Sequence, residues 1–437
     1  MKKIVLIMLL AVLLLSISAC QKKDDTDPVT IIWLPHTSRD SGEGAVFYPL
    51  FDQWKAANPD INLVENYVGG DDVKIKIKAD ASADMLPDVF FFWGTLSNNE
   101  YLLESGMVVP TKDIVAEVPN LRMENISPST LGTISYRGVP YGIPYTATFA
   151  GFFVNTAIYE KCGVPLPDTY PAFTYEQFRK DAEVFRKNGY IPLAHGWEAG
   201  NPGHFYLSQL INQLPGGTQS MLDLLNYKNM AGSGNLATGM RYVIEDIRLG
   251  VYQDNVIADS WNQMTALFQQ ERAAANYTHV NQLGQFNNDP VLASRIKLMP
   301  FPKIPEAVKD SNQQVAIAPA YNYFVSAKSW KDPKKRQAIV RFLDFIFGKE
   351  AIIAFTKFQQ PALSFDFDIP EENFSTIYKN AAKFAHGKEE VPFFLAVVPD
   401  SAAWQNFKNV LMEIVIGQLS PENGEKAIGA VFAEMGK

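Results

Sequence analysis

The stretch YGIPYTATFAGFFVN, residues 141–155, sets the pattern by which the rest of the chain is interpreted. Pro144 has a fixed φ and disfavours the helical conformation in the residue before it, so the stretch begins extended. The aromatic and β-branched residues of 149–155 then favour a strand that ends at a turn residue. Tyr145 and Thr148 add a ring face and a hydroxyl, which suit a sugar and equally suit a buried strand with a polar edge. The stretch therefore predicts a strand and leaves open whether that strand carries a binding site.

The chain outside this stretch alternates between strand and helix patterns. Residues 31–34 and 61–67 predict strands, and the residues between them carry apolar side chains at helical spacing. Residues 88–93 predict a short apolar strand of the buried parallel kind. Residues 73–81 fit both an alternating strand and one face of a helix, whereas residues 332–346 predict an amphipathic helix. Such alternation predicts an α/β fold.

The N-terminus has the pattern of a secretory precursor. Two lysines precede the apolar run of residues 4–15, and small residues follow up to Cys20. The run is too short to span a bilayer, which takes ~20 residues. Residues 15–20 resemble a bacterial lipobox, which implies that residues 1–19 are a signal peptide and that Cys20 is lipidated. An ordinary signal peptide with a chance cysteine is the alternative, and in both cases residues 20–28 form a polar tether.

Charge and cysteine content exclude several classes. Without its first two lysines the chain keeps 37 of its 39 basic side chains against 47 acidic ones, a formal charge of −10. This argues against nucleic acid as a partner and against a basic membrane-binding face. The mature chain is long enough for two or more domains. Cys162 is the one cysteine besides Cys20, so we expect no intramolecular disulfide, and no Cys/His spacing predicts a metal site.

Four stretches occur in a familiar order along the chain. They are FDQWKAANPDINLVE (51–65), MLPDVFFFWG (85–94), the segment from YGIPYT to LAHG (141–196) and the segment from FVSAK to IIAF (324–355). Together they resemble the family 1 extracellular solute-binding proteins, the sugar-binding components of bacterial ABC importers. The resemblance extends over nearly all of the mature chain, and it favours a helix for residues 73–81.

The resemblance implies an α/β, two-lobed fold of the type II periplasmic-binding-protein class, with a hinge of crossing strands. It places residues 29–143 and about 304–346 in the N-terminal lobe, and residues 144–303 and about 347–437 in the C-terminal lobe. A carbohydrate would be enclosed between the lobes and then passed to permease subunits. We expect a monomer without a cofactor, anchored by lipid to the cell envelope and facing the periplasm or the exterior.

Candidate ligand-binding residues follow from the same resemblance. They lie in the loop after the first strand, at the end of the apolar strand of residues 88–93, just after the segment that first crosses between the lobes, and near the later strands and the C-terminal helix. Trp197 is added because it follows a predicted strand and precedes Glu198. The candidates are His36, Thr37, Ser38, Trp93, Thr95, Tyr145, Thr148, Phe149, Trp197, His279, Asn281, Tyr321, Asn322 and Trp404. Each has a structural alternative, because rings at strand or helix spacing often only pack and a histidine can simply hydrogen-bond its own loop.

The sequence also departs from the family pattern. The tryptophan that the family carries after an Ala-Ala-Met element is missing, since Ala273-Ala-Ala275 leads to His279-Val-Asn281. The ligand therefore stays open, and a non-sugar solute or a protein partner remain alternatives. A surface glycan hydrolase would need paired carboxylates, whereas the predicted site carries rings, Thr, Asn and His. No Gly-x-Ser-x-Gly or His-Glu-x-x-His motif occurs, so we expect a binding protein and no enzyme.

Overall fold

The computed structural model describes most of residues 27–435. The residues in this span that it leaves out are 70–71, 127–129, 132–133, 227–231, 281–285, 287–288, 310–312, 320, 358–359, 362–366, 371, 373, 375, 386 and 399–400. The predicted signal peptide, Cys20, most of the tether and the candidate Asn281 lie outside the described residues. Within the described part of the chain, no helix has both the length and the apolar content that crossing a membrane needs.

The first sheet has the strand order β2-β1-β3-β12-β6. Its strands are β1 (Val29–Leu34), β2 (Ile61–Glu65), β3 (Val89–Trp93), β6 (Ile143–Pro144) and β12 (Tyr321–Val325). β1 pairs in parallel with β2 and β3, and β12 runs antiparallel to both β3 and β6. The carboxyl ends of β1, β2, β3 and β6 therefore share one edge with the first residue of β12.

Helices α2 (Gly42–Ala57), α3 (Asp72–Ser82), α4 (Leu96–Glu104), α16 (Pro333–Ile346) and α17 (Lys349–Phe355) surround this sheet. The prediction of a helix over residues 73–81 is confirmed, because α3 buries Val73, Ile77 and Ala81 on one face. The core of this lobe centres on Trp33, whose ring centroid lies 5.1 Å from that of Phe51 and 5.0 Å from that of Phe342. Packing of this kind accounts for most of the stability of a helix on a sheet.

The second sheet has the order β14-β11-β7-β9-β8. It comprises β7 (Thr146–Asn155), β8 (Ile191–Ala194), β9 (Ala273–His279), β11 (Gln314–Pro319) and β14 (Glu389–Val391), while β10 (Ile296–Met299) and β13 (Gln360–Pro361) also pair with β7. The strand predicted within residues 141–155 is confirmed, with Tyr145 between its two pieces, β6 and β7. β8 and β9 are parallel, and β7 runs against β9, so the start of β7 and the ends of β8 and β9 lie at one edge.

The helices of the second lobe cover this sheet on both sides. The ones that matter for the site are α9 (Gly203–Asn212), α11 (Asn235–Leu249), α12 (Trp261–Gln269), α19 (Phe394–Val397), α20 (Ser401–Val415) and α21 (Pro421–Met435). The carboxylate of Glu425 in α21 accepts hydrogen bonds from the backbone of Gly232, Gly234 and Ala237 at the start of α11. This contact fixes the C-terminal helix to the rest of the lobe.

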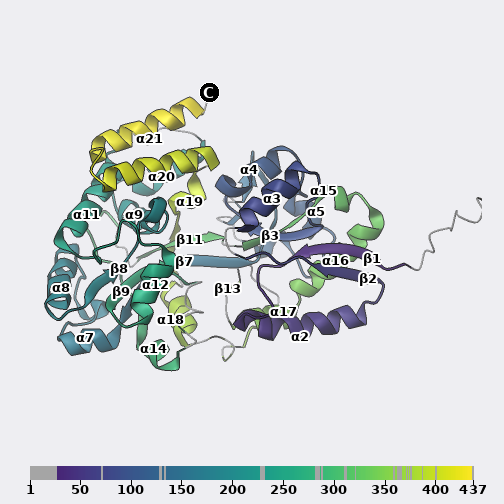
Figure 1. The fold of residues 1–437 in the computed structure, drawn as a ribbon, viewed down its shortest axis with the longest axis horizontal. Helices are drawn as coiled ribbons and strands as arrows, with labels where there is room; N and C mark the ends of the chain where they lie inside the picture. The colour runs from purple at the N-terminus through teal and green to yellow at the C-terminus, as the bar shows by residue number, and fades with distance from the viewer. Residues whose placement is uncertain are drawn as a thin grey trace, which may run out of the picture.

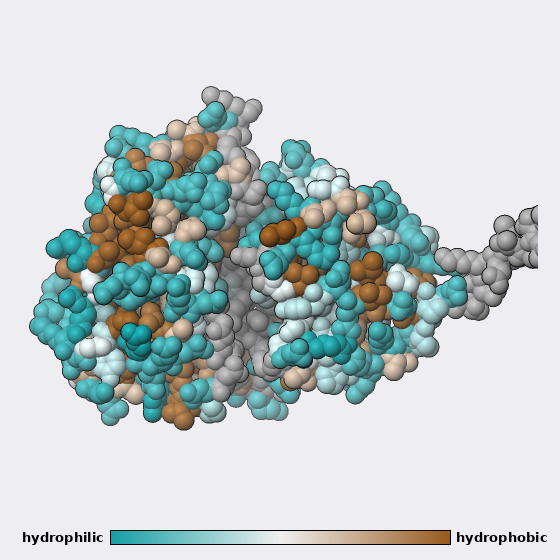
Figure 2. All heavy atoms as spheres, viewed as in Figure 1, coloured by the Kyte–Doolittle hydropathy of each residue, from teal (hydrophilic) through white to brown (hydrophobic). Residues whose placement is uncertain are grey.

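Figure 1 shows two groups of elements joined by β7 and β11, and each group has its own hydrophobic core. The sheets differ from the predicted lobe boundaries in two places. β11 follows residue 304 but pairs with β7, so it belongs to the second sheet. α17 follows residue 347, yet Ile352 and Phe355 pack in the core of the first lobe. Figure 2 shows a mostly hydrophilic surface on this face of both lobes, broken by separate hydrophobic patches.

Candidate functional site

The sheet edges that carry the carboxyl ends of the parallel strands meet where the chain passes between the two sheets. The backbone N–H of Tyr145 donates to the carbonyl of Tyr321 over 2.8 Å, and the N–H of Tyr321 donates to Thr146 Oγ1 over 3.0 Å. These bonds tie the end of β6, the start of β7 and the start of β12 together. We call this region the junction. Ligands of α/β sheets bind at the carboxyl ends of parallel strands, and both sheets present such ends to the junction.

His36 follows β1 and has fixed partners at both ring nitrogens. Nδ1 lies 2.7 Å from the Tyr323 hydroxyl, and Nε2 lies 2.6 Å from Glu43 Oε1. The His36 side chain is only 1% exposed, and its ring centroid lies 5.0 Å from that of Tyr145. Because both ring nitrogens have a side-chain partner, the His36 ring is held in one orientation and helps to position the residues around the junction.

Tyr145 contributes a buried phenol to the junction. Its ring centroid lies 4.3 Å from that of Phe355, and its hydroxyl has no hydrogen-bond partner among the described residues. Burial raises the pKa of Tyr145 well above its ordinary value, so the phenol is neutral at pH 7. An unpartnered buried hydroxyl is a group that a ligand can satisfy.

Thr37 and Ser38 shape the loop between β1 and α2. Ser41 Oγ lies 2.7 Å from Thr37 Oγ1, donates to the Ser38 carbonyl over 2.9 Å, and accepts from the N–H of Gly44 over 2.8 Å. A Cβ on Gly44 would lie 1.9 Å from the Ser38 oxygen, so only glycine allows this loop to close onto the helix. The two predicted residues therefore set the loop's shape through bonds within it.

Trp93 ends β3 at the mouth of the first sheet. Its ring is partly exposed, lies 6.0 Å from the Tyr321 ring between centroids, and has Lys74 Nζ 4.8 Å from its centroid. The ammonium of Lys74 is thus held against the electron-rich indole. Thr95 Oγ1 accepts a hydrogen bond from Asn98 Nδ2 over 2.7 Å at the start of α4.

Asn322 is the most unusual polar residue of the junction. It lies in β12 opposite Phe92 and is completely buried, yet neither atom of its side-chain amide has a partner in the described part of the chain. Gly94 lies against it, and a Cβ there would be 2.0 Å from Nδ2. Leaving a buried amide unpartnered costs ~1–3 kcal/mol, which a bound ligand could recover.

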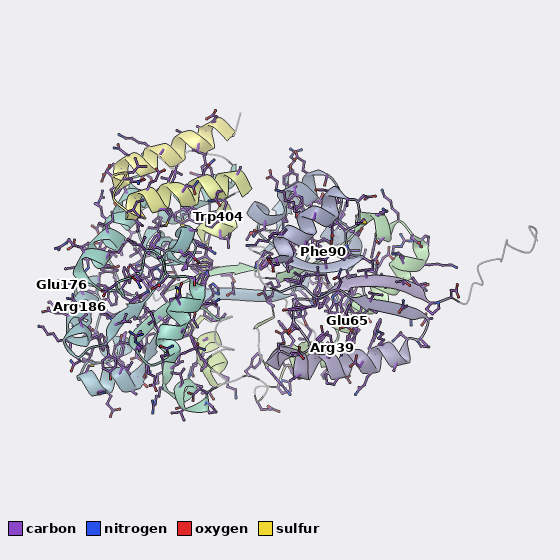
Figure 3. The ribbon with its side chains drawn as sticks, viewed as in Figure 1. Arg39, Glu65, Phe90, Glu176, Arg186 and Trp404 are labelled. Carbon is purple, nitrogen blue, oxygen red and sulfur yellow. The ribbon has the colours of Figure 1, made fainter. Side chains whose placement is uncertain are left out.

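The second lobe contributes Thr148, His279 and Trp404. The Thr148 hydroxyl is buried without a partner among the described residues. His279 ends β9; burial lowers its pKa to about 4, so the imidazole is neutral. Trp404 lies in α20, which together with α19 contacts α4 of the first lobe, and Figure 3 shows Trp404 on the side of its lobe that faces α4.

Two predicted residues lie elsewhere. Trp197 is completely buried, and its ring fills the space that a Cβ on Gly203 would need, 2.2 Å from the nearest ring atom. Phe149 is also buried, in a core cluster of the second lobe with Phe153. The structure thus brings the other described candidates to the junction and leaves these two in the core.

The junction also gathers residues that the sequence analysis did not single out. His204 and Phe205 begin α9, and Trp261 begins α12; the rings of Phe205 and Trp261 both pack against His279. On the sequence, these residues follow the apolar spacing of ordinary core helices. The available signal was the position of Trp261 directly after Ser260, a good N-cap residue.

Three cavities that the described residues enclose lie away from the junction. They have volumes of about 810, 790 and 620 Å³ and are open grooves on the second lobe. Figure 3 shows Arg186, which lines the grooves of 810 and 620 Å³, and Glu176, which lines the groove of 620 Å³, on the side of that lobe remote from the first lobe. We regard the junction as the candidate site, because it combines strand ends from both sheets with buried polar groups that have no partner among the described residues. Within the described residues, no group of three or more His, Cys, Asp or Glu side chains could hold a metal ion.

Comparison with known proteins identifies the family and the fold of the chain. The family model "Bacterial extracellular solute-binding protein" matches residues 39–353. No curated protein sequence matches the chain. Among solved structures, a chitin oligosaccharide binding protein superposes with a TM-score of 0.77 at 18% identity, covering 94% of this chain and 99% of its own.

Two other solved structures are similar over comparable lengths. One, from work on xylan utilisation by the thermophilic bacterium Caldanaerobius polysaccharolyticus, gives a TM-score of 0.76 at 20% identity and covers 92% of this chain and all of its own. Maltose-bound MalE3 of T. maritima gives 0.70 at 11% identity, covering 93% of this chain and all of its own. At such identities the likeness shows the fold, a two-lobed solute-binding architecture.

Proposed function

The chain belongs to the bacterial extracellular solute-binding protein family, and from that premise we propose that it binds a mono- or oligosaccharide at the junction and delivers it to an ABC importer permease. The family is a substrate-binding, non-catalytic class. Its structural neighbours include a chitin oligosaccharide binding protein and proteins bound to maltose and to α-D-tagatose. Those names describe the neighbours, and they support a carbohydrate as the ligand class here.

The observation that carries the proposal is the composition of the junction walls. Buried polar groups that have no partner within the described part of the chain come from both lobes: the side chains of Asn322 and Tyr145 from the first, and the Thr148 hydroxyl and His279 Nδ1 from the second. All four are neutral, and aromatic rings lie beside them. A sugar offers C–H faces to rings and hydroxyls to neutral donors and acceptors, so it matches this set better than an ion does.

A ligand bound by residues of both lobes would couple its binding to closure of the two lobes. A ligand that contacts both lobes binds the closed form more tightly than the open one, and only such differential affinity shifts a hinge equilibrium. We place the hinge where the chain passes between β6 and β7 and between β11 and β12, and we divide the lobes there. The closed form would be the one that the permease recognises.

The N-terminal sequence supports a location at the cell envelope. We propose that residues 1–19 are removed and that lipid on Cys20 anchors the protein, which then faces the periplasm or the cell exterior. Several acyl chains on one residue hold stably, since each buried CH₂ contributes ~0.8 kcal/mol. Neither a cofactor nor a second copy of the chain is required for binding in this scheme.

A thermal-shift screen of the mature chain against a carbohydrate panel tests the proposal. A carbohydrate at one hundred times its Kd should add ~2.7 kcal/mol of apparent stability and raise the melting temperature. The variant Asn322→Ala should lose most of that shift while still melting cooperatively. Stabilisation by a phosphate ester or a polyamine, with none across the carbohydrates, would contradict the proposed ligand class.

A further inference from the structure

We infer that His204 and Trp261 form, together with His279 and Trp404, a subsite in the second lobe that holds an uncharged hydroxylated ring of the ligand. The inference rests on the proposed function and assigns two residues that neither the sequence pattern nor the family match assigns. Four observations support it. They are the hydrogen bonds that fix the backbone at Trp261, the angles at which neighbouring rings contact its indole, the imidazole nitrogens of His204 and His279 that have no partner among the described residues, and the position of the cluster at the edge of the second sheet.

Trp261 stands at the fixed start of a helix. Ser260 and Gln263 form a capping box, in which the Ser260 N–H donates to Gln263 Oε1 over 2.7 Å and the Gln263 N–H donates to Ser260 Oγ. Asp259, just before the cap, accepts a hydrogen bond from Gln253 over 2.7 Å. The backbone that carries the indole is therefore set by hydrogen bonds on both sides.

Part of the Trp261 side chain is accessible. Trp33 and Trp197 are completely buried, whereas Trp261 is only partly buried. Its ring meets the His279 ring at 4.3 Å and 58°, and the Phe205 ring at 5.4 Å and 73°. Neither neighbour lies flat on the indole, so neither provides the parallel stacking that a sugar's C–H face would provide.

The imidazoles beside it need hydrogen-bond partners. His204 is completely buried, and neither ring nitrogen has a partner in another described residue; Nδ1 of His279 is likewise buried and unpartnered. Burial and the charge of Lys408 hold the pKa of His204 well below its ordinary value. A neutral imidazole carries one donor and one acceptor, which two hydroxyl groups of one ring can satisfy together.

The cluster lies at the junction edge of the second sheet. The His204 ring is 4.9 Å from that of Trp404 at 89°, and Trp404 is on the helix that contacts α4 of the first lobe. His279 is the last residue of β9 and lies opposite Ala150, midway along β7. A ring held here would therefore be within the proposed site, on its second wall.

His195 provides a matched control. It too is completely buried, neither of its ring nitrogens has a partner among the residues that the structure describes, and burial lowers its pKa to about 3. Its ring neighbours, however, are Trp197, Tyr206 and Tyr252, all of them buried in the core of the second lobe. Replacing His195 should thus reproduce the folding cost of losing a buried histidine without touching the subsite.

The test compares Trp261→Leu, His204→Gln and His195→Gln by calorimetric titration with the carbohydrate that stabilises the wild type most. Trp261→Leu should weaken binding ~5- to 10-fold and His204→Gln ~10-fold or more, while His195→Gln stays within ~2-fold. Trp261→Leu should also reduce the ligand-dependent change in tryptophan fluorescence. Because Trp261 is partly exposed, this variant tests the subsite even if His204→Gln does not fold.

The outcomes separate the subsite from the function on which it rests. A wild-type protein that binds carbohydrate, with Trp261→Leu and His204→Gln binding equally well, overturns the subsite and leaves the proposed function intact. Equal weakening by His195→Gln and His204→Gln, with no effect of Trp261→Leu, also overturns it. A wild-type protein that binds no carbohydrate overturns both.

Discussion

Gly94 lies against the side-chain amide of Asn322 so closely that a Cβ on Gly94 would stand 2.0 Å from Nδ2 and 2.8 Å from Cγ of Asn322. Asn322 cannot move away easily, because its backbone pairs with Phe92 on one side and Pro144 on the other. The absence of a side chain at residue 94 is therefore what allows the buried amide to occupy its place at the junction.

We expect Gly94→Ala to displace that amide. The substitution should weaken carbohydrate binding ~10-fold or more and lower the unfolding free energy by ~1–3 kcal/mol. Titration calorimetry and denaturant unfolding measure the two effects. Gly106→Ala is the control: Gly106 has a φ of +66° with open space around it, so it should lose ~1 kcal/mol of stability and keep full affinity. Wild-type affinity in Gly94→Ala would contradict the role given to Asn322.

The hydroxyl of Tyr323 should matter to stability because it holds His36. Tyr323→Phe leaves Nδ1 of His36 without its partner at 2.7 Å, which should cost ~1–2 kcal/mol in denaturant unfolding. The matched control is Tyr101→Phe, whose hydroxyl is buried with no partner among the described residues. That change should be neutral or slightly stabilising. Equal losses in the two variants would show that the contact with His36 contributes nothing specific.

Stability should fall as the pH drops below about 6.5. Burial lowers the pKa of His195 to about 3 and that of His279 to about 4, and it lowers that of His204 as well. The unfolded chain, with histidine pKa values of ~6.5, then binds three protons that the folded chain does not bind. Asp246 acts in the opposite direction, because burial raises its pKa to about 6 and the folded chain alone protonates it between pH 6 and 4.

The balance near pH 5 is about two protons taken up on unfolding, a slope of ~3 kcal/mol per pH unit. Denaturant unfolding at pH 7, 6 and 5 measures it. His195→Gln should reduce the slope by ~1.4 kcal/mol per unit, and Asp246→Asn should increase it by a similar amount. A stability that does not change between pH 6.5 and 5 would show that these histidines titrate normally in the folded protein.

Ala199 adopts a φ of +48°, a region that glycine occupies without strain. We expect Ala199→Gly to raise the unfolding free energy by up to ~1 kcal/mol by relieving that strain. The same substitution at Ala56, an exposed helical residue of α2, should lower it by ~0.5–1 kcal/mol. A loss of stability in both variants would indicate that Ala199 is not strained.

Local patterns were enough to predict much of the fold. The strand around Phe152 and the helix of residues 333–346 depend on spacing and on Pro, Gly and cap residues, which act over a few neighbours. The lobe assignment of residues 314–319 could not be predicted in this way. It depends on which distant strand they pair with, and their partner β7 lies more than 150 residues earlier in the chain.

Single residues of the candidate site could not all be predicted from local sequence either. Trp93 and Trp197 both follow or end a short strand, and nothing local distinguishes them. Trp93 stays at the junction, whereas Gly203 lets α9 pack directly on the ring of Trp197. The sequence analysis did not single out Trp261, because its exposure depends on packing against His279 and Phe205, which belong to elements remote in sequence.

Hydrogen–deuterium exchange of the mature protein, with and without its best carbohydrate, tests the central claim most directly. The account predicts that the ligand slows exchange on both sides of the junction, in the segments around residues 34–38, 93–95 and 321–323 of the first lobe and around residues 146–149, 276–279 and 401–405 of the second. Protection of one lobe alone, or of the outer groove lined by Gln253 and Arg272, would contradict it.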